Sequence, residues 1–115
     1  MDHKELDVWK KSMVLVTDIY KISNNFPNSE LYGLTSQIRR AAVSIPSNIA
    51  EGTARKGDKE LIQFISIALG SLAEIETQYL IAINLKYIEE DKIMLASMTD
   101  VKKLLLGFRN YLKRK

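Results

Sequence analysis

The residues "LIQFISIALGSLAEIETQYLIAINL", positions 61–85, carry the strongest secondary-structure signal in the chain. Their apolar side chains recur four and three residues apart through three heptads, which is the spacing of one face of an α-helix. This seam comprises Leu61, Ile65, Ala68, Leu72, Ile75, Tyr79 and Ala82. Such a seam is typical of a helix packed nearly antiparallel to its neighbours. We therefore predict a long helix over residues 58–85, with Asp58 as its cap.

The same stretch has more apolar surface than a monomeric bundle requires, because 16 of its 25 residues are aliphatic, alanine or aromatic. Outside the seam, one flank comprises Ile62, Leu69, Leu80 and Ile83, and another comprises Phe64, Ile67 and Ile81. A helix that is apolar on most sides is normally buried on most sides. We predict that part of this surface is an interface between subunits of a homo-oligomer.

Three other segments show the same helical periodicity. The first should run over residues 4–24, from a capping box of Asp2 and Glu5 to the turn before Pro27. Its predicted core face comprises Leu6, Trp9, Met13, Val16 and Tyr20. The second should cover residues 30–54, with Leu34, Ile38, Ala41, Ile45 and Ile49 in the core. The fourth should cover residues 90–112, with Met94, Met98, Val101, Leu105, Phe108 and Leu112 in the core.

No segment alternates between apolar and polar residues with a period of two, so the sequence predicts no strand. Four amphipathic helices joined by short loops favour an all-α fold, an up-down-up-down antiparallel four-helix bundle. A length of 115 residues is within the range of one domain. We expect residues 1–115 to form a single bundle domain.

Pro46 lies in the interior of the second predicted helix. It removes the hydrogen bond to the carbonyl of Ala42 and costs about 3 kcal/mol, so we predict a kink there. We expect compensation from a polar network of Arg40, Ser44, Asn48, Glu51 and Glu74, in which Arg40 pairs with Glu51 or Glu74. The facing stripe on the third helix would be Gln63, Ser66, Gly70 and Glu74, with Ser71 nearby. Alternatively, the kink opens a polar pocket for a ligand or a phosphate.

The composition excludes several kinds of site. The chain has no cysteine, so disulfides and thiolate metal sites are excluded. The only histidine is His3, whereas the di-iron centres of helix bundles need Glu-x-x-His pairs on facing helices. Neither a phosphate-binding glycine loop nor a serine-histidine-acid set is present. We predict no catalytic residue, no metal and no cofactor, and, in the absence of a signal peptide or a long apolar run, a soluble cytoplasmic protein.

Basic residues are concentrated near the end of the chain. The net charge is +3, and from Lys102 onward there are six basic residues and no acidic one. A basic tail is more often simply solubilising, and the alternative is that these residues mark a phosphate-binding surface. The candidate nucleic-acid-binding residues are Arg39, Arg55, Lys56, Lys102, Lys103, Arg109, Lys113, Arg114 and Lys115. In a ring of subunits, symmetry would repeat this charge as a basic rim or channel.

Two questions about aromatic residues stay open at this point. Phe108 fits the core seam, whereas Tyr111 is equally consistent with packing and with stacking on a base. Trp9 would be an anchor for a protein partner if it were exposed, but its position in the first stripe favours core packing. The competing hypothesis is therefore a protein-interaction scaffold, in which the basic residues only keep the protein soluble.

The segments "YGLTSQIRRAAVSIPSNIAEG" and "ARKGDKELIQFISIALGSLAEIETQYLIA" resemble the four-helix-bundle proteins encoded by intervening sequences within bacterial 23S ribosomal RNA genes. The resemblance covers about residues 5–112. It implies a ring-shaped homopentamer of left-handed antiparallel bundles, no assigned catalytic residues, and a role near ribosomal or other RNA. A similar accessory protein of diversity-generating retroelements binds a reverse transcriptase and nucleic acid through a basic surface. The chain departs from the family at Lys86, where a glycine often precedes the tyrosine, so we expect the third loop to be built differently.

Overall fold

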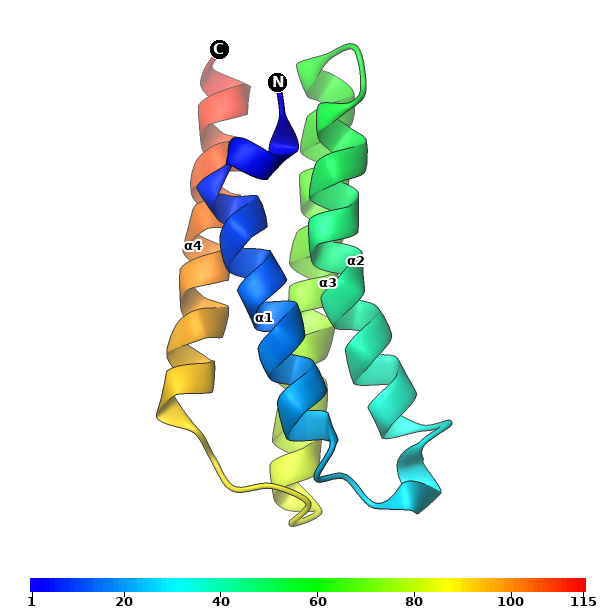
Figure 1. The fold of residues 1–115 in the computed structure, drawn as a ribbon. Helices are drawn as coiled ribbons and strands as arrows, with labels where there is room; N and C mark the ends of the chain where they lie inside the picture. Colours follow the sequence, from blue (N-terminus) through cyan, green and yellow to red (C-terminus); the bar gives the residue numbers. More distant parts are fainter.

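In the computed structural model, which describes all 115 residues, the chain is helical and has no strand. The helices are α1 (Asp7–Ser23), α2 (Leu34–Thr53), α3 (Asp58–Asn84) and α4 (Lys92–Arg114), with the 3₁₀ turns η1 (His3–Glu5) and η2 (Asn28–Glu30). Consecutive helices run in alternating directions (Figure 1). Each helix packs on its neighbours in sequence, and α4 also packs on α1, which closes the bundle. The predicted all-α four-helix bundle is confirmed.

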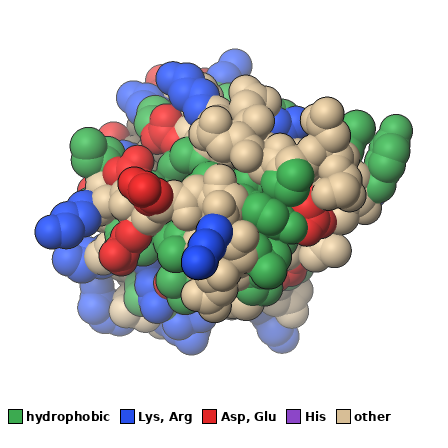
Figure 2. Space-filling model, turned by 90° about the horizontal axis from the view of Figure 1, so that it is seen from below, with side chains coloured by type: hydrophobic (Ala, Val, Ile, Leu, Met, Phe, Trp, Pro, Cys, Tyr) green, Lys and Arg blue, Asp and Glu red, His purple; other side chains and the backbone are tan.

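The two ends of the bundle differ in what they hold. We call the end with both chain termini and the α2–α3 loop, residues 54–57, the terminal end (Figure 1). The opposite end holds the α1–α2 connection, residues 24–33, and the α3–α4 loop, residues 85–91. Figure 2 looks onto the opposite end, where acidic and basic side chains are interspersed around exposed hydrophobic ones. None of the four helices combines the length and the apolar character that crossing a membrane would need.

The core confirms the seams predicted for three of the helices. Every residue of the α2 and α3 seams is buried, and so is every residue of the α4 seam except Phe108. Phe108 is half-buried and packs against the core. These residues and those of α1 form one hydrophobic cluster that runs along the bundle.

The core face predicted for α1 is wrong. The buried apolar residues are Val8, Leu15 and Ile19, whereas Met13 and Tyr20 are exposed. Leu6, Trp9 and Val16 lie partly buried at the edge of the core. The true face contains Ser12, which interrupts the apolar pattern. Its hydroxyl donates to the carbonyl of Trp9 at 2.8 Å, so this buried polar group is satisfied.

The predicted helix starts also need correction. The carboxylate of Asp2 accepts from the N–H of Lys4 at 3.0 Å and caps η1, so α1 begins only at Asp7. Gly57, not Asp58, is the N-cap of α3. At α4 the cap is Asp91, whose carboxylate accepts from the N–H groups of Ile93 and Met94. The backbone N–H of Asp91 in turn donates to the buried hydroxyl of Tyr79 at 2.6 Å, which fixes the loop to α3.

The contact between α2 and α3 is the most extensive in the bundle. Paired side chains follow it at intervals of about one heptad, as expected for antiparallel helices. Within the helices the pairs are Gln37 with Gln78 and Ser44 with Ser71, and the backbone of Gly52 lies against Phe64. Glu30, before α2, and Tyr87, after α3, form a further pair in the same series. At Gly52, an added Cβ would lie 2.8 Å from the Cβ of Phe64 and 2.9 Å from Cδ1 of Leu61. Gly52 therefore allows the two helices to approach closely.

Pro46 lies inside α2, and the helix continues past it to Thr53. Its side chain is buried. Two residues later, the amide of Asn48 donates to the carbonyl of Ser44 at 2.8 Å and to its hydroxyl at 2.9 Å. Side-chain bonds thus reinforce the backbone beside the proline, while a kink at Pro46 stays a prediction.

Glu30 joins the start of α2 to the α3–α4 loop. Its carboxylate accepts from the N–H of Leu34 at 3.1 Å and from the hydroxyl of Tyr87 at 2.8 Å. Gly33 leaves room for this arrangement, because a Cβ there would lie 2.6 Å from Oε1 of Glu30. The hydrogen bond from Leu34, and then that from Tyr87, lower the pKa of Glu30. The hydrogen bond to Glu30, followed by burial, raises the pKa of Tyr87.

Helix α3 ends at Asn84, and two residues later the backbone adopts the left-handed conformation. Lys86 has φ 63° and is the only residue other than glycine with a positive φ. The N–H of Tyr87 bonds to the carbonyl of Ala82, and that of Lys86 to the carbonyl of Ile83, both at 2.9 Å, which is the Schellman pattern of a helix end. The position therefore favours the glycine that the family resemblance leads us to expect.

Gly52→Ala should lower the free energy of unfolding by about 1–3 kcal/mol, because the added methyl group overpacks the α2–α3 contact. Gly107→Ala is the matched control, since Gly107 is also inside a helix and a Cβ there meets nothing within 4 Å. It should raise the free energy of unfolding by about 0.5–1 kcal/mol through helix propensity. Urea denaturation of both variants measures the difference; equal effects would contradict the close approach.

Lys86→Gly should raise the free energy of unfolding by about 0.5–1 kcal/mol. It removes a steric cost of about 1–2 kcal/mol, part of which is offset by the greater entropy of glycine in the unfolded chain. Lys86→Ala keeps the Cβ and should change the stability little. If thermal and urea unfolding gave the two variants the same stability, Lys86 would not be strained.

Part of the stability should be lost in acid through Glu30. Because folding lowers its pKa, the stabilisation is fully present above the ordinary pKa of 4.5 and is lost as the pH falls through the lower folded value. Glu30→Gln cannot ionise, so its free energy of unfolding should fall less than that of the wild type between about pH 5 and pH 3. Glu90→Gln, at an exposed carboxylate of the same end, is the control. Parallel pH profiles of the wild type and Glu30→Gln would refute this account.

Candidate nucleic-acid interface

The terminal end gathers basic residues from two distant parts of the sequence. Arg55 and Lys56 lie in the α2–α3 loop, and the last residues of α4 reach the same end (Figure 1). An ion pair of 3.1 Å between Nζ of Lys115 and Oδ2 of Asp58 joins the two parts. We call Arg55, Lys56, Lys113, Arg114 and Lys115, all of which are exposed, the terminal cluster.

Carboxylates border the terminal cluster without fixing it. Arg55 lies 3.9 Å from Oε1 of Glu51 and 3.9 Å from Oε2 of Glu60, and its guanidinium lies 5.1 Å from the ring centroid of Phe64. Exposed ion pairs of this length contribute little free energy. A phosphate that approaches the terminal cluster therefore competes only with weak partners.

Helix α4 extends the basic surface away from the terminal end. Residues three, four and seven apart share a helix face, so Lys102, Arg109 and Lys113 form one row. Lys103 and Arg114 lie on the adjacent row. Four of these five residues are exposed, namely Lys102, Lys103, Lys113 and Arg114. Arg109 is half-buried, and its Nε is buried without a hydrogen-bond partner. The candidate residues of α4 thus form a basic strip that ends at the terminal cluster.

The two aromatic residues of α4 have different environments. Phe108 packs against the core. Tyr111 is 53% exposed, and the Nζ of Lys115 lies 5.7 Å from its ring centroid. The question left open by the sequence is therefore answered for Tyr111, which is not a core residue.

Arg39 does not belong with the other predicted basic residues. It lies towards the opposite end, where its Nε donates to the hydroxyl of Ser23 at 2.7 Å and its Nη2 to Oδ1 of Asn24 at 2.9 Å. Its guanidinium also lies 4.7 Å from the ring centroid of Tyr20. These contacts tie the end of α1 to α2 and set Arg39 apart from the terminal cluster, while its role in nucleic-acid binding stays a prediction.

The polar network predicted around Pro46 forms only in part. The hydroxyls of Ser44 and Ser71 lie 2.8 Å apart, and Asn48 bonds to Ser44. The predicted pairing of Arg40 with Glu51 or Glu74 is wrong. Arg40 and Glu74 are exposed and form no ion pair within the chain, and Glu51 instead lies beside Arg55.

The stripe expected on α3 is also largely wrong. Gln63, Ser66, Gly70 and Glu74 are exposed, and only the adjacent Ser71 faces α2. All four lie on a solvent-facing side of α3 next to the buried seam, so they do not form a buried network with the stripe on α2. Because Ser44, Asn48 and Ser71 bond to one another, they favour the structural interpretation over a ligand pocket.

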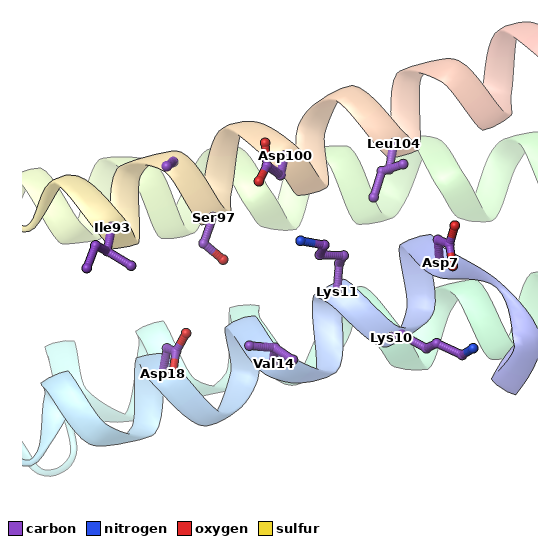
Figure 3. A pocket seen from close by; sticks show the side chains of 10 residues that line it. Asp7, Lys10, Lys11, Val14, Asp18, Ile93, Ser97, Asp100 and Leu104 are labelled. Carbon is purple, nitrogen blue, oxygen red and sulfur yellow. The ribbon is translucent and has the colours of Figure 1, made fainter.

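A groove between α1 and α4 was not predicted from the sequence. It has a volume of about 650 Å³, and Figure 3 shows its lining side chains on the two facing helices. From α1 these are Asp7, Lys10, Lys11, Val14 and Asp18, and from α4 they are Ile93, Ala96, Ser97, Asp100 and Leu104. No two of its charged groups form an ion pair. The sequence feature that could have predicted this groove is the presence of two apolar residues outside the seams, Val14 and Ile93.

Neither region has the features of a reaction centre. No three His, Cys, Asp or Glu side chains lie close enough together to hold a metal ion. His3 is in the N-terminal turn, with its ring edge against Trp9 at a centroid distance of 5.3 Å. Trp9 itself is half-buried against the core, as its position in the sequence favoured.

Comparison with known proteins agrees with this geometry. The family described as 23S rRNA-intervening sequence protein matches residues 4–107. Among solved structures, the chain is similar to a protein of unknown function from the S23 ribosomal protein family of Bacteroides thetaiotaomicron, with a TM-score of 0.78 and 26% sequence identity. That similarity covers 89% of this chain and 97% of the other. No curated protein matches the chain.

Proposed function

This chain belongs to the 23S rRNA-intervening sequence protein family, and from that premise we propose that it is a non-enzymatic, cytoplasmic homo-oligomer that binds RNA through its terminal end. The observation that carries the proposal is the convergence of Arg55 and Lys56 with Lys113 to Lys115. RNA presents a regular series of phosphates, and each lysine or arginine that neutralises one releases a counterion. Exposed cations on flexible side chains, weakly paired with carboxylates, suit this kind of binding.

Assembly into a ring would strengthen the interface. Each chain carries a net charge of +3, so five copies would carry +15, that is 5 × 3, with the terminal clusters related by symmetry. We propose a pentamer, as the family resemblance implies. Support for oligomerisation comes from apolar side chains of α3 that stay exposed in one chain, namely Ile67, Leu80 and Ile81.

The proposal assigns no catalytic residue. Candidate acids and bases are scattered over the surface, and the two side chains whose pKa values shift, Glu30 and Tyr87, bond to each other as part of the fold. A shifted pKa indicates an active site only when the group also faces a cleft with convergent chemistry. Here the shift has a structural explanation.

The groove between α1 and α4 favours the second candidate function, a protein-interaction scaffold. Its apolar side chains include Ile93, which is 80% exposed, and charges of both signs border them (Figure 3). An apolar strip with charged edges suits an amphipathic helix of a partner. In that case the basic strip on α4 would only keep the protein soluble.

The purified protein should bind a fluorescently labelled RNA hairpin with a single-stranded tail, and its affinity should fall steeply as salt is raised. The triple variant Lys56→Gln, Lys113→Gln, Arg114→Gln should bind more weakly. Its slope of log affinity against log salt should be smaller by about 0.7–0.9 for each phosphate that the protein no longer neutralises. Fluorescence anisotropy at several salt concentrations measures both quantities.

The matched control is Lys21→Gln, Lys86→Gln, Lys92→Gln, which removes the same charge at the opposite end and should bind nearly as the wild type. If both triple variants bound RNA equally weakly, the terminal end would not be the interface. If the wild type bound no RNA even at low salt, and a protein partner from lysate survived nuclease treatment, the scaffold would be the better account. Light scattering of the same sample should give an oligomer, and a monomer at micromolar concentration would contradict that part of the proposal.

A further inference from the structure

Tyr111 is an exposed aromatic residue beside two cations of the terminal cluster, Arg114 and Lys115. It lies one turn before the end of α4, and more than half of its surface is open to solvent. Lys113 and Arg114 follow it closely, and Lys115 places its ammonium 5.7 Å from the ring centroid. That ammonium also lies 3.1 Å from Oδ2 of Asp58 in an exposed ion pair.

Neither packing nor hydrogen bonding within the chain explains this ring. The core position of the last two turns is taken by Leu112, which is buried. The hydroxyl of Tyr111 makes no hydrogen bond in the chain, in contrast to the hydroxyls of Tyr79 and Tyr87. A large aromatic surface is therefore left in water beside Arg114 and Lys115 of the terminal cluster.

The other exposed tyrosines have different surroundings. Tyr20 carries the guanidinium of Arg39 over its ring, inside a set of contacts that joins α1 to α2. Tyr32 is 94% exposed but lies in the connection at the opposite end, outside the basic strip. Tyr111 is thus the one exposed tyrosine that lies within the candidate interface.

We infer that the terminal end recognises unpaired bases, with Tyr111 as the ring on which a base stacks and with Arg114 and Lys115, three and four residues further on, as partners of the adjacent phosphates. An aromatic ring between cations is the combination that binds single strands, because the ring stacks on a base while the cations follow the backbone. In a duplex both faces of each base are already stacked, so the ring contributes little there. This inference rests on the proposed function and specifies its ligand as single-stranded nucleic acid.

The test uses the full-length protein with a labelled single-stranded RNA and with the duplex of the same sequence. Tyr111→Leu should weaken binding of the single strand by about 5- to 150-fold, which corresponds to the removal of one base stack of about 1–3 kcal/mol. Binding of the duplex should be nearly unchanged. Tyr111→Phe keeps the ring and should retain the affinity for the single strand. Because Tyr111 is exposed and outside the core, the variants should keep the circular dichroism spectrum of the wild type.

Tyr32→Leu is the matched control, since it removes an exposed tyrosine at the opposite end and should bind both RNAs as the wild type. The inference fails if Tyr111→Leu binds the single strand as well as the wild type while the salt-dependent affinity persists. In that outcome the proposed RNA-binding function survives without the preference for unpaired bases. If the wild type binds neither RNA at low salt, the proposed function itself fails.

Discussion

The contact between helices α2 and α3 is the most extensive in the bundle, and near one end it depends on a glycine that lets the two helices approach closely. Gly52 leaves no space for a Cβ, and the facing hydroxyls of Ser44 and Ser71 lie at hydrogen-bond distance. Close approach brings the apolar seams of both helices into full contact, and all of their residues are buried. Helices α1 and α4 pack on this pair less closely, and a groove remains between them. The α2–α3 pair is thus the more closely packed half of the bundle, and its loop carries part of the basic surface.

Much of the fold could be predicted from the sequence, because the burial of apolar residues at helical spacing is the largest favourable term in folding. The seams of α2, α3 and α4 follow from that term alone. The core face of α1 could not be predicted in this way, because Ser12 occupies a buried position and meets its hydrogen-bonding requirement locally through Trp9. A hydropathy pattern counts Ser12 as polar, but it does not show the carbonyl of Trp9 that accepts the hydrogen bond of its hydroxyl.

The ends of the helices were predicted less well, because distant residues fix them. Glu30 holds the start of α2 while it is itself bonded by Tyr87, 57 positions away. Arg39 is a similar case, since only the fold shows that its guanidinium is engaged by Ser23 and Asn24. Of the candidate interface, the basic residues themselves were visible in the sequence. Their convergence at one end of the bundle could not be predicted, because it depends on the lengths of α3 and α4 and on the end that each helix reaches.

The alternating directions of the helices have an electrostatic consequence. Two helix N-termini and two C-termini meet at each end, so the helix dipoles nearly cancel and leave the side chains to set the potential. The terminal end combines the cations of Arg55, Lys56 and Lys113 to Lys115 with bordering carboxylates, and the opposite end sets both signs around exposed hydrophobic side chains (Figure 2). Any assembly that keeps the long axes of its subunits parallel would therefore be a disc with two unlike sides. Under the proposed function, the side with the terminal cluster would attract polyanions, and the other side would be available to a different class of molecule.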